Sequence, residues 1–284
     1  MELFRIIKSD AKKALRFCSG RITASAIIIA LFWLLFTVAE SVLHFIFVGP
    51  KSIYFSFENV VKSPVALSIT TAISVVWLFV MPALFLGFKK LCLYFAEGKD
   101  ESISMIFDTF TSFKKFFGSF FFAIGFAIRW ILVFGIAILP GGSIFWFTEK
   151  YVPDSGRLFL LIKVSLFFLA GGIMVLCVFL GIIFTQRWSL AAFYRTLGFG
   201  VQKSFSLSAK ATKGFCTNII SFKFSFIGWG LLSLLIFPLL YSIPFCSVSF
   251  AIYGKYLMQR YENSLAEVPE ILSEDSAAEE EIDG

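Results

Sequence analysis

The segment Gly181–Tyr256 decides the fold. An apolar run (GIIFT, 181–185) meets a basic, polar stretch (QRWSLAAFYRTLGFGVQKSFSLSAKATKG, 186–214), and two further apolar runs follow. Helices that cross the hydrocarbon core of a membrane need about 20 predominantly apolar residues. The pattern therefore predicts a hairpin of membrane helices with a positively charged connection.

The composition of the whole chain agrees with this interpretation. Of 284 residues, 58% are hydrophobic and 15% are charged, whereas soluble domains are about 45–50% apolar and about 25% charged. The composition therefore argues against a water-soluble globule. The basic residues lie between apolar runs, so anionic phospholipid headgroups, and not nucleic acid, are the expected partners.

Working outward from the central segment, we predict an all-α integral membrane bundle with about six transmembrane helices. Pro140-Gly141-Gly142 is expected to end or kink the third span, and the last span is short enough to be tilted or partly interfacial. The predicted spans are Ile22–Val48, Val65–Phe88, Phe116–Leu139, Leu158–Thr185, Cys216–Pro238 and Phe245–Met258.

Three parts of the chain are expected. Residues 1–21 have an apolar face at helical spacing opposite a basic face, which is typical of a helix lying in the membrane interface. Residues 22–261 form the membrane domain. Residues 262–284 hold nine of the 19 acidic residues and lack apolar periodicity, so they are expected to be a disordered acidic tail.

The orientation in the membrane follows from the positions of Lys and Arg. Eighteen of them lie in 1–21, 89–115, 186–214 and at the end of the last apolar run, and four lie in 49–64 and 141–157. Because cytoplasmic loops carry the excess of Lys and Arg, both termini are predicted to be cytoplasmic.

Short motifs at fixed spacing carry a resemblance to a known family. They are Gly181-Ile182-Ile183, Arg187-Trp188-Ser189, Ser208 with Lys213-Gly214, Ser225-Phe226-Ile227-Gly228-Trp229 and Pro244-Phe245. With these motifs the chain resembles the domain-of-unknown-function "nine-seven-five" family of uncharacterised bacterial multi-span membrane proteins. Leu180 stands where that family has a kinking proline. The resemblance implies a multi-pass protein of the bacterial cell (inner) membrane, and it implies no activity.

The sequence offers no catalytic, cofactor or metal motif that we can name, so we expect a protein that is not an enzyme and has no cofactor. His44 is the only histidine, which excludes multi-histidine metal sites. Glu40 and His44 are four residues apart on the first span and could share a metal or a hydrogen bond. We expect the hydrogen bond.

Arg129 lies inside the third predicted span. A central Arg costs about 2.5–3.5 kcal/mol on insertion scales, so it should have a partner or a water-filled cavity. Glu40 is the only acid expected at membrane depth, and we predict an Arg129–Glu40 ion pair. A substrate or ion pathway and simple snorkelling remain alternatives for Arg129. Lys163 and Lys223 lie near helix ends, where snorkelling is enough.

The expected function is that of a non-enzymatic membrane component that interacts with lipids or other membrane proteins. The alternative is a small transporter or channel that uses Arg129 and Glu40. The residues expected to contact anionic lipid are Lys8, Lys12, Lys13, Arg16, Lys89, Lys90, Lys114, Lys115, Lys210 and Lys213.

Overall fold

The computed structural model describes residues 2–49, 63–153, 156–232 and 236–282, and all regular structure in these ranges is helical. Four segments are long and apolar enough to cross a membrane, and a bent pair of helices is a candidate for a fifth. This part of the chain therefore forms an all-α membrane protein. The four segments are Cys18–Val48, Pro64–Ala96, Phe113–Tyr151 and Arg157–Thr196.

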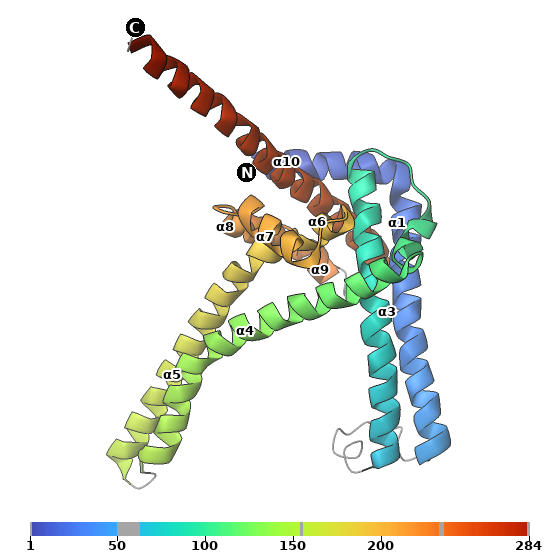
Figure 1. Ribbon diagram of the computed structural model, residues 1–284. Coiled ribbons are helices and arrows are strands. Elements are labelled where there is room, and N and C mark those ends of the chain that lie inside the picture. Colours follow the sequence, from blue (N-terminus) through green and yellow to red (C-terminus); the bar gives the residue numbers. More distant parts are fainter. Residues whose placement is uncertain (1, 50–62, 154–155, 233–235, 283–284) are drawn as a thin grey trace.

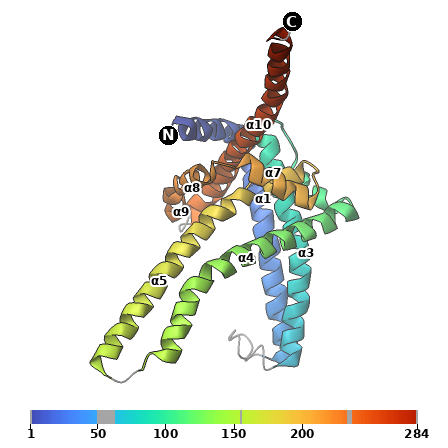
Figure 2. The same ribbon diagram turned by 60° about the vertical axis from the view of Figure 1, so that its left-hand side comes forward.

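The long helices form two hairpins that diverge from a common end, as Figures 1 and 2 show. One hairpin pairs α1 (Glu2–Val48) with α3 (Pro64–Ala96), and the other pairs α4 (Phe113–Tyr151) with α5 (Arg157–Thr185). α4 crosses α3 near its own start, where Phe79 stacks on Phe120 at 4.0 Å between ring centroids. It then bends and runs down beside α5.

The sequence sets the ends of α3 directly. The side chain of Ser63 accepts a hydrogen bond from the backbone of Ala66 at 3.4 Å, and Pro64 occupies the first turn. Both are favoured at helix starts. After the last turn Gly98 adopts a positive φ of 73°, which glycine allows at little cost.

We call the common end of the hairpins the junction. It consists of the helices that pack around the end of α3. Besides the N-terminal part of α1 and the long helix α10 (Ile236–Ile282), these are the short helices η2 (Ile103–Phe110), η3 (Gln186–Trp188), α6 (Ala191–Thr196), α7 (Val201–Ala211), α8 (Cys216–Phe224) and α9 (Ile227–Leu232). The protein core lies here, with Leu84, Leu91, Ile106, Phe193, Ile219, Phe222 and Tyr253 buried. The hairpins instead expose large apolar side chains, as helices facing lipid do.

The N-terminal part of α1 packs on protein. Its apolar face is buried in the junction core, including Ile7, Ala11 and Leu15. Phe4 contacts the rings of Phe222 in α8 and Tyr253 in α10, at 5.1 and 6.0 Å between centroids. The amphipathic face was predicted correctly, but its partner was not: other helices cover the face that was expected to enter the membrane interface.

The third predicted span does not end at Leu139. α4 continues through Pro140 to Tyr151, which is compatible with a membrane helix because neighbouring groups can satisfy the freed backbone. The glycine after the proline has a packing role. A Cβ on Gly141 would lie 2.7 Å from the carbonyl oxygen of Ala170 and 2.7 Å from Cβ of Met174, so glycine allows α4 and α5 to approach closely.

The fifth predicted span, Cys216–Pro238, is broken. α8 and α9 are nine and six residues long, and the turn at Ser225 and Phe226 separates them. Together, as the segment Cys216–Leu232, they form the bent pair with α7 at an angle of 87°. Polar side chains and Lys223 dilute the apolar run, and the described residues hold four candidate spans, or five with this pair, where six were predicted. The sixth predicted span, Phe245–Met258, lies in α10.

The acidic tail differs from the expectation of disorder. The backbone of α10 stays helical through Ile282, and this part of the helix projects away from the rest of the molecule (Figure 1). Glu and Ala in this part are good helix formers, whereas Pro269 opposes the helix. Glu and Ala extend an existing helix and need no new nucleus.

Candidate functional site

The residues expected to contact lipid fall into two groups. Five have partners: Lys8 donates to the carbonyl of Ser225, Lys13 pairs with Asp10, Lys90 and Lys115 pair with Asp108, and Lys89 lies among aromatic rings. The other five are exposed, and no hydrogen bond or ion pair to them occurs among the described residues. These exposed cations are Lys12, Arg16, Lys114, Lys210 and Lys213.

The expected Arg129–Glu40 ion pair does not form. Arg129 donates to the carbonyl of Gly125 and to Oε1 of Gln202, both at 2.8 Å, and its guanidinium lies 3.9 Å from the centroid of the Phe205 ring. These contacts place it against α7 at the junction. The cause is the path of α4, which contacts α7 before it turns beside α5 and so keeps Arg129 away from α1.

Glu40 belongs to a different network near the far end of the first hairpin. The hydroxyl of Thr70 donates to Oε1 of Glu40 at 2.9 Å, and Nε2 of His44 lies 2.9 Å from the same hydroxyl oxygen. Because the hydroxyl proton is directed to Glu40, Nε2 must be the donor in the second bond. Nε2 of His44 lies 3.9 Å from Oε1 of Glu40, so the two predicted partners are linked through Thr70 of α3 and not by a direct hydrogen bond.

Asp108 neutralises part of the basic surface at the junction. Its carboxylate accepts from Lys90 at 2.7 Å and from Lys115 at 3.0 Å. Burial acts to raise the pKa of Asp108, but the hydrogen bonds and charges of the two lysines outweigh it, and the pKa lies below its usual value. This cluster is internally paired, so it is a weak candidate for binding an external anion.

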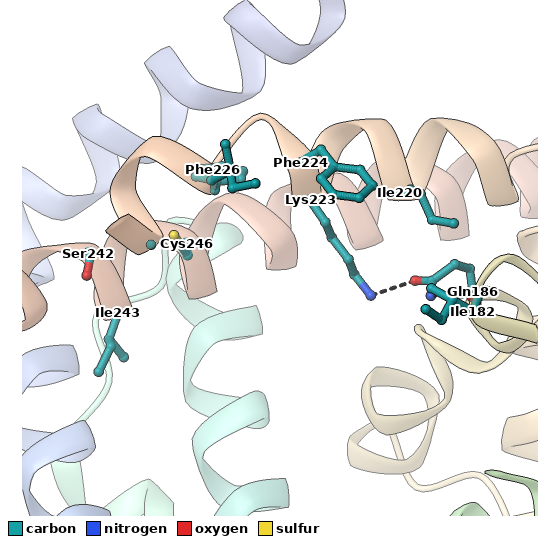
Figure 3. A pocket seen from close by; sticks show the side chains of 11 residues that line it. Ile182, Gln186, Ile220, Lys223, Phe224, Phe226, Ser242, Ile243 and Cys246 are labelled. Carbon is teal, nitrogen blue, oxygen red and sulfur yellow. Dashed lines mark hydrogen bonds between the residues drawn. The ribbon is translucent and has the colours of Figure 1, made fainter. Parts of the chain in front are cut away.

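A less compensated basic site lies where α5 ends against α8. Lys223 donates to Oε1 of Gln186 at 2.6 Å, while Nε2 of Gln186 donates to the carbonyl of Ile182 at 2.8 Å. The second bond fixes the amide so that its oxygen faces Lys223. Figure 3 shows the lysine side chain reaching from α8 toward Gln186.

A second ammonium group approaches the same place from α3. Lys89 lies 5.8 Å and Lys223 lies 5.2 Å from the centroid of the Phe250 ring in α10. Such contacts stabilise a cation by about 0.5–2 kcal/mol, but they leave its charge in place. Among the described residues, no carboxylate forms an ion pair with either lysine.

Two adjoining pockets surround these lysines. The larger, of about 530 Å³, lies between the end of α5, α8–α9 and α10 and is mostly apolar. The smaller, of about 250 Å³, contains Lys89 and Phe250. Lys223, Phe226 and Cys246 line both, so the two pockets form one site, which we call the two-lysine pocket.

The chemistry of the two-lysine pocket is that of an anion site with an apolar extension. The chain's single histidine lies on α1 and does not line the pocket, whose lining includes the thiol of Cys246 and the amine of Lys223. Among the residues that the structure describes, no group of three His, Cys, Asp or Glu side chains could hold a metal ion. The arrangement is suited to binding an anion.

Sequence reasoning missed most of this pocket. Lys223 was explained by snorkelling, and Gln186 was not noticed. The usable signal was the composition of the segment 216–232, where a lysine interrupts an apolar run that contains no acid. Lys89 was predicted to face lipid headgroups at the surface, and it instead lies inside the junction among Phe85, Phe193 and Phe250.

No protein-family model matches the chain, and comparison with curated proteins and solved structures also gave no match. Membership of the family that the motifs resemble therefore stays a prediction.

Proposed function

We propose that this multi-span protein is a non-enzymatic component of a bacterial cell membrane that associates with anionic phospholipid through its basic junction. The observation that carries the proposal is that five of the cations expected to contact lipid are exposed at the junction: Lys12, Arg16, Lys114, Lys210 and Lys213. Each Lys or Arg near an anionic membrane surface contributes about 1 kcal/mol of attraction. Several acting together hold the junction against the headgroups.

The packing of α1 supports this assignment. Its apolar face is covered by α8 and α10, so the N-terminal part of α1 presents its charged face outward, with Lys12 and Arg16 exposed. Association at this surface is therefore electrostatic and depends on ionic strength.

The proposal places the junction and both termini in the cytoplasm. Support comes from the eighteen basic residues at this end of the spans against four at the other. Alkaline phosphatase inserted between Glu149 and Gly156 would then be active, and the same enzyme fused at Gly284 would be inactive.

Transport through an Arg129–Glu40 pathway is not proposed, because the two side chains have separate partners. The lipid proposal is tested by purifying the protein with mixed phosphatidylglycerol and phosphatidylcholine and measuring the phosphatidylglycerol that it retains. Replacing all five exposed cations by Gln should lower this retention at low salt. The difference should shrink near 1 M salt, where the Debye length is about 3 Å.

The control for this experiment changes cations at the other end of the molecule. Lys150→Gln with Arg157→Gln, near the tips of α4 and α5, should leave the retention as it is in the wild type. Equal retention by the wild type and the five-residue variant at low salt would show that the proposed function is wrong.

A further inference from the structure

The two lysines of the two-lysine pocket create an electrostatic requirement. Lys89 and Lys223 approach one ring, Phe250, and both line the same small pocket. Two ammonium groups close together repel each other, and the apolar side chains around them reduce their hydration in part, since Lys89 is half-buried and Lys223 is exposed. A single negative charge placed between them would offset both effects.

Lys223 is held in position for such a charge. An ammonium group has three donors, and Gln186 takes one of them at 2.6 Å. The bond from Gln186 to the carbonyl of Ile182 fixes the amide in turn. Lys223 therefore keeps two donors for an anion, while no acceptor hydrogen-bonds to Lys89 among the described residues.

The larger pocket adds an apolar volume directly beside the charge. It is lined by side chains such as Ile182, Ile220 and Ile243, and its volume of about 530 Å³ is within the range of ligand sites, about 300–1,000 Å³. Its rim is exposed: Phe224 and Ile227 are 57% and 61% exposed. An apolar, open rim next to the positively charged Lys223 is suited to a ligand with an anionic head and a hydrocarbon tail.

We propose that the two-lysine pocket is a specific binding site for one anionic phospholipid. Its phosphate lies between Lys89 and Lys223, and one acyl chain follows the apolar wall formed by Ile182, Ile220 and Ile243. This inference deepens the proposed function and rests on it, because it assigns one defined site to a protein proposed to associate with anionic lipid through its surface.

Charge complementarity distinguishes this ligand from others. A zwitterionic phospholipid has the same tail and adds a cation beside the two lysines. A soluble phosphate satisfies the lysines and leaves the apolar wall without a partner. The anionic phospholipid satisfies both parts of the pocket, and Gln186 acts as a positioning residue that holds Lys223 toward the phosphate.

Native mass spectrometry of the full-length protein in mild detergent tests the site. The probe is phosphatidylglycerol, with phosphatidylcholine of the same acyl chains and inorganic phosphate as comparison arms. We expect one phosphatidylglycerol to bind on the order of tenfold more tightly than phosphatidylcholine, and inorganic phosphate not to displace it. Lys223→Gln should weaken the binding on the order of tenfold, the usual scale for a charge-assisted hydrogen bond.

Matched variants make the result specific. Lys223→Arg keeps the charge and should restore most of the binding. Lys203→Gln removes an exposed lysine that contacts Phe199 but does not line the pocket, and it should have the wild-type affinity. Should Lys223→Gln fail to fold, Ile243→Trp decides the matter, because it fills the apolar wall and keeps both lysines: lost binding supports the proposal, and wild-type binding overturns it.

The contrary outcomes separate the site from the broader function. Equal weakening by Lys223→Gln and Lys203→Gln would mean that binding is spread over the basic surface, so the site is wrong while the proposed function stands. Displacement of phosphatidylglycerol by inorganic phosphate would mean that the ligand is a soluble anion. Equal affinity of the wild type for the two lipids would overturn the site and the proposed function together.

Discussion

The two hairpins solve the same problem in different ways. Lipid tails are as apolar as the helices, so burial of apolar area does not hold membrane helices together, and close packing or polar contacts must do so. α1 and α3 are joined near their far end by the hydrogen-bonded chain through Glu40, Thr70 and His44. α4 and α5 are joined by the close approach at Gly141 and, near their tips, by the Lys163–Glu149 ion pair at 3.2 Å.

The difference teaches which substitutions each hairpin tolerates. The close packing at Gly141 leaves no space for another carbon atom. The α4–α5 contact is therefore sensitive to the size of a substituted side chain and much less to its polarity. The network at Thr70 is sensitive to the loss of a hydroxyl and less to shape. The polar side chains of the two hairpins, such as Glu40 and Arg129, have separate hydrogen-bond partners. Whether the two hairpins contribute independently to stability can therefore be tested.

Gly141→Ala should have the largest effect. The new Cβ would lie 2.7 Å from the carbonyl oxygen of Ala170, so the backbone of α5 must move, and overpacking of this kind costs about 1–3 kcal/mol. The measurement is the thermal stability of the purified protein in detergent.

The control for that change is on the same helix. Gly135→Ala meets no atom within 4 Å, and alanine favours helix more than glycine does, so its stability should equal or exceed that of the wild type. If both variants lose the same stability, the close approach at Gly141 does not hold α4 and α5 together.

Thr70→Val should have a smaller effect, about 1 kcal/mol of destabilisation, because hydrogen bonds between membrane helices are individually modest. Valine keeps the shape of threonine and removes the hydroxyl that donates to Glu40. Thr37→Val is the matched control, since Thr37 bonds only to the carbonyl of Trp33 in its own helix at 3.0 Å. A loss at Thr37 as large as that at Thr70 would contradict a linking role for Thr70.

The smallest expected effect is the coupling between the hairpins. Arg129→Leu and Glu40→Leu should each destabilise the protein, and the double variant should lose the sum of the two losses within about 0.5 kcal/mol, because the residues share no partner. Thermal stabilities of the wild type, the single variants and the double variant give the coupling energy. If the double variant loses clearly less stability than the sum of the two single losses, Arg129 and Glu40 interact, and the absence of an ion pair in this structure is contradicted.

The sequence predicted the long elements well. Apolar runs of sufficient length identified α1, α3, α4 and α5, because the length of a membrane helix is set by the bilayer and can be counted along the chain. It failed at Cys216–Pro238, where the count was sufficient but Lys223 and polar side chains favoured two short helices. At Pro140 it left an end and a kink of the span open, because a proline's effect on a membrane helix depends on its neighbours, and the helix does not end there.

The candidate site was harder to predict than the spans. The basic residues expected to contact lipid do lie near one end of the bundle. The structure separates them into side chains that are exposed and side chains that have partners within the protein. Lys12 and Lys213 reach solvent, whereas Lys89 turns inward to Phe250. The direction in which a lysine side chain points depends on the helices packed beside it, and these neighbours cannot be read from the sequence.

By itself, the sequence determined the class of the protein, the four long apolar helices and the concentration of positive charge at one end, because hydrophobicity and charge are properties of single residues and short windows. Only the tertiary structure decided the partners. In the folded protein Arg129 hydrogen-bonds to Gln202 and Thr70 hydrogen-bonds to Glu40. Lys89 and Lys223 both lie near the ring of Phe250. The physical reason is that each partner comes from a different helix, and the path of α4 and the break between α8 and α9 fix which helices meet.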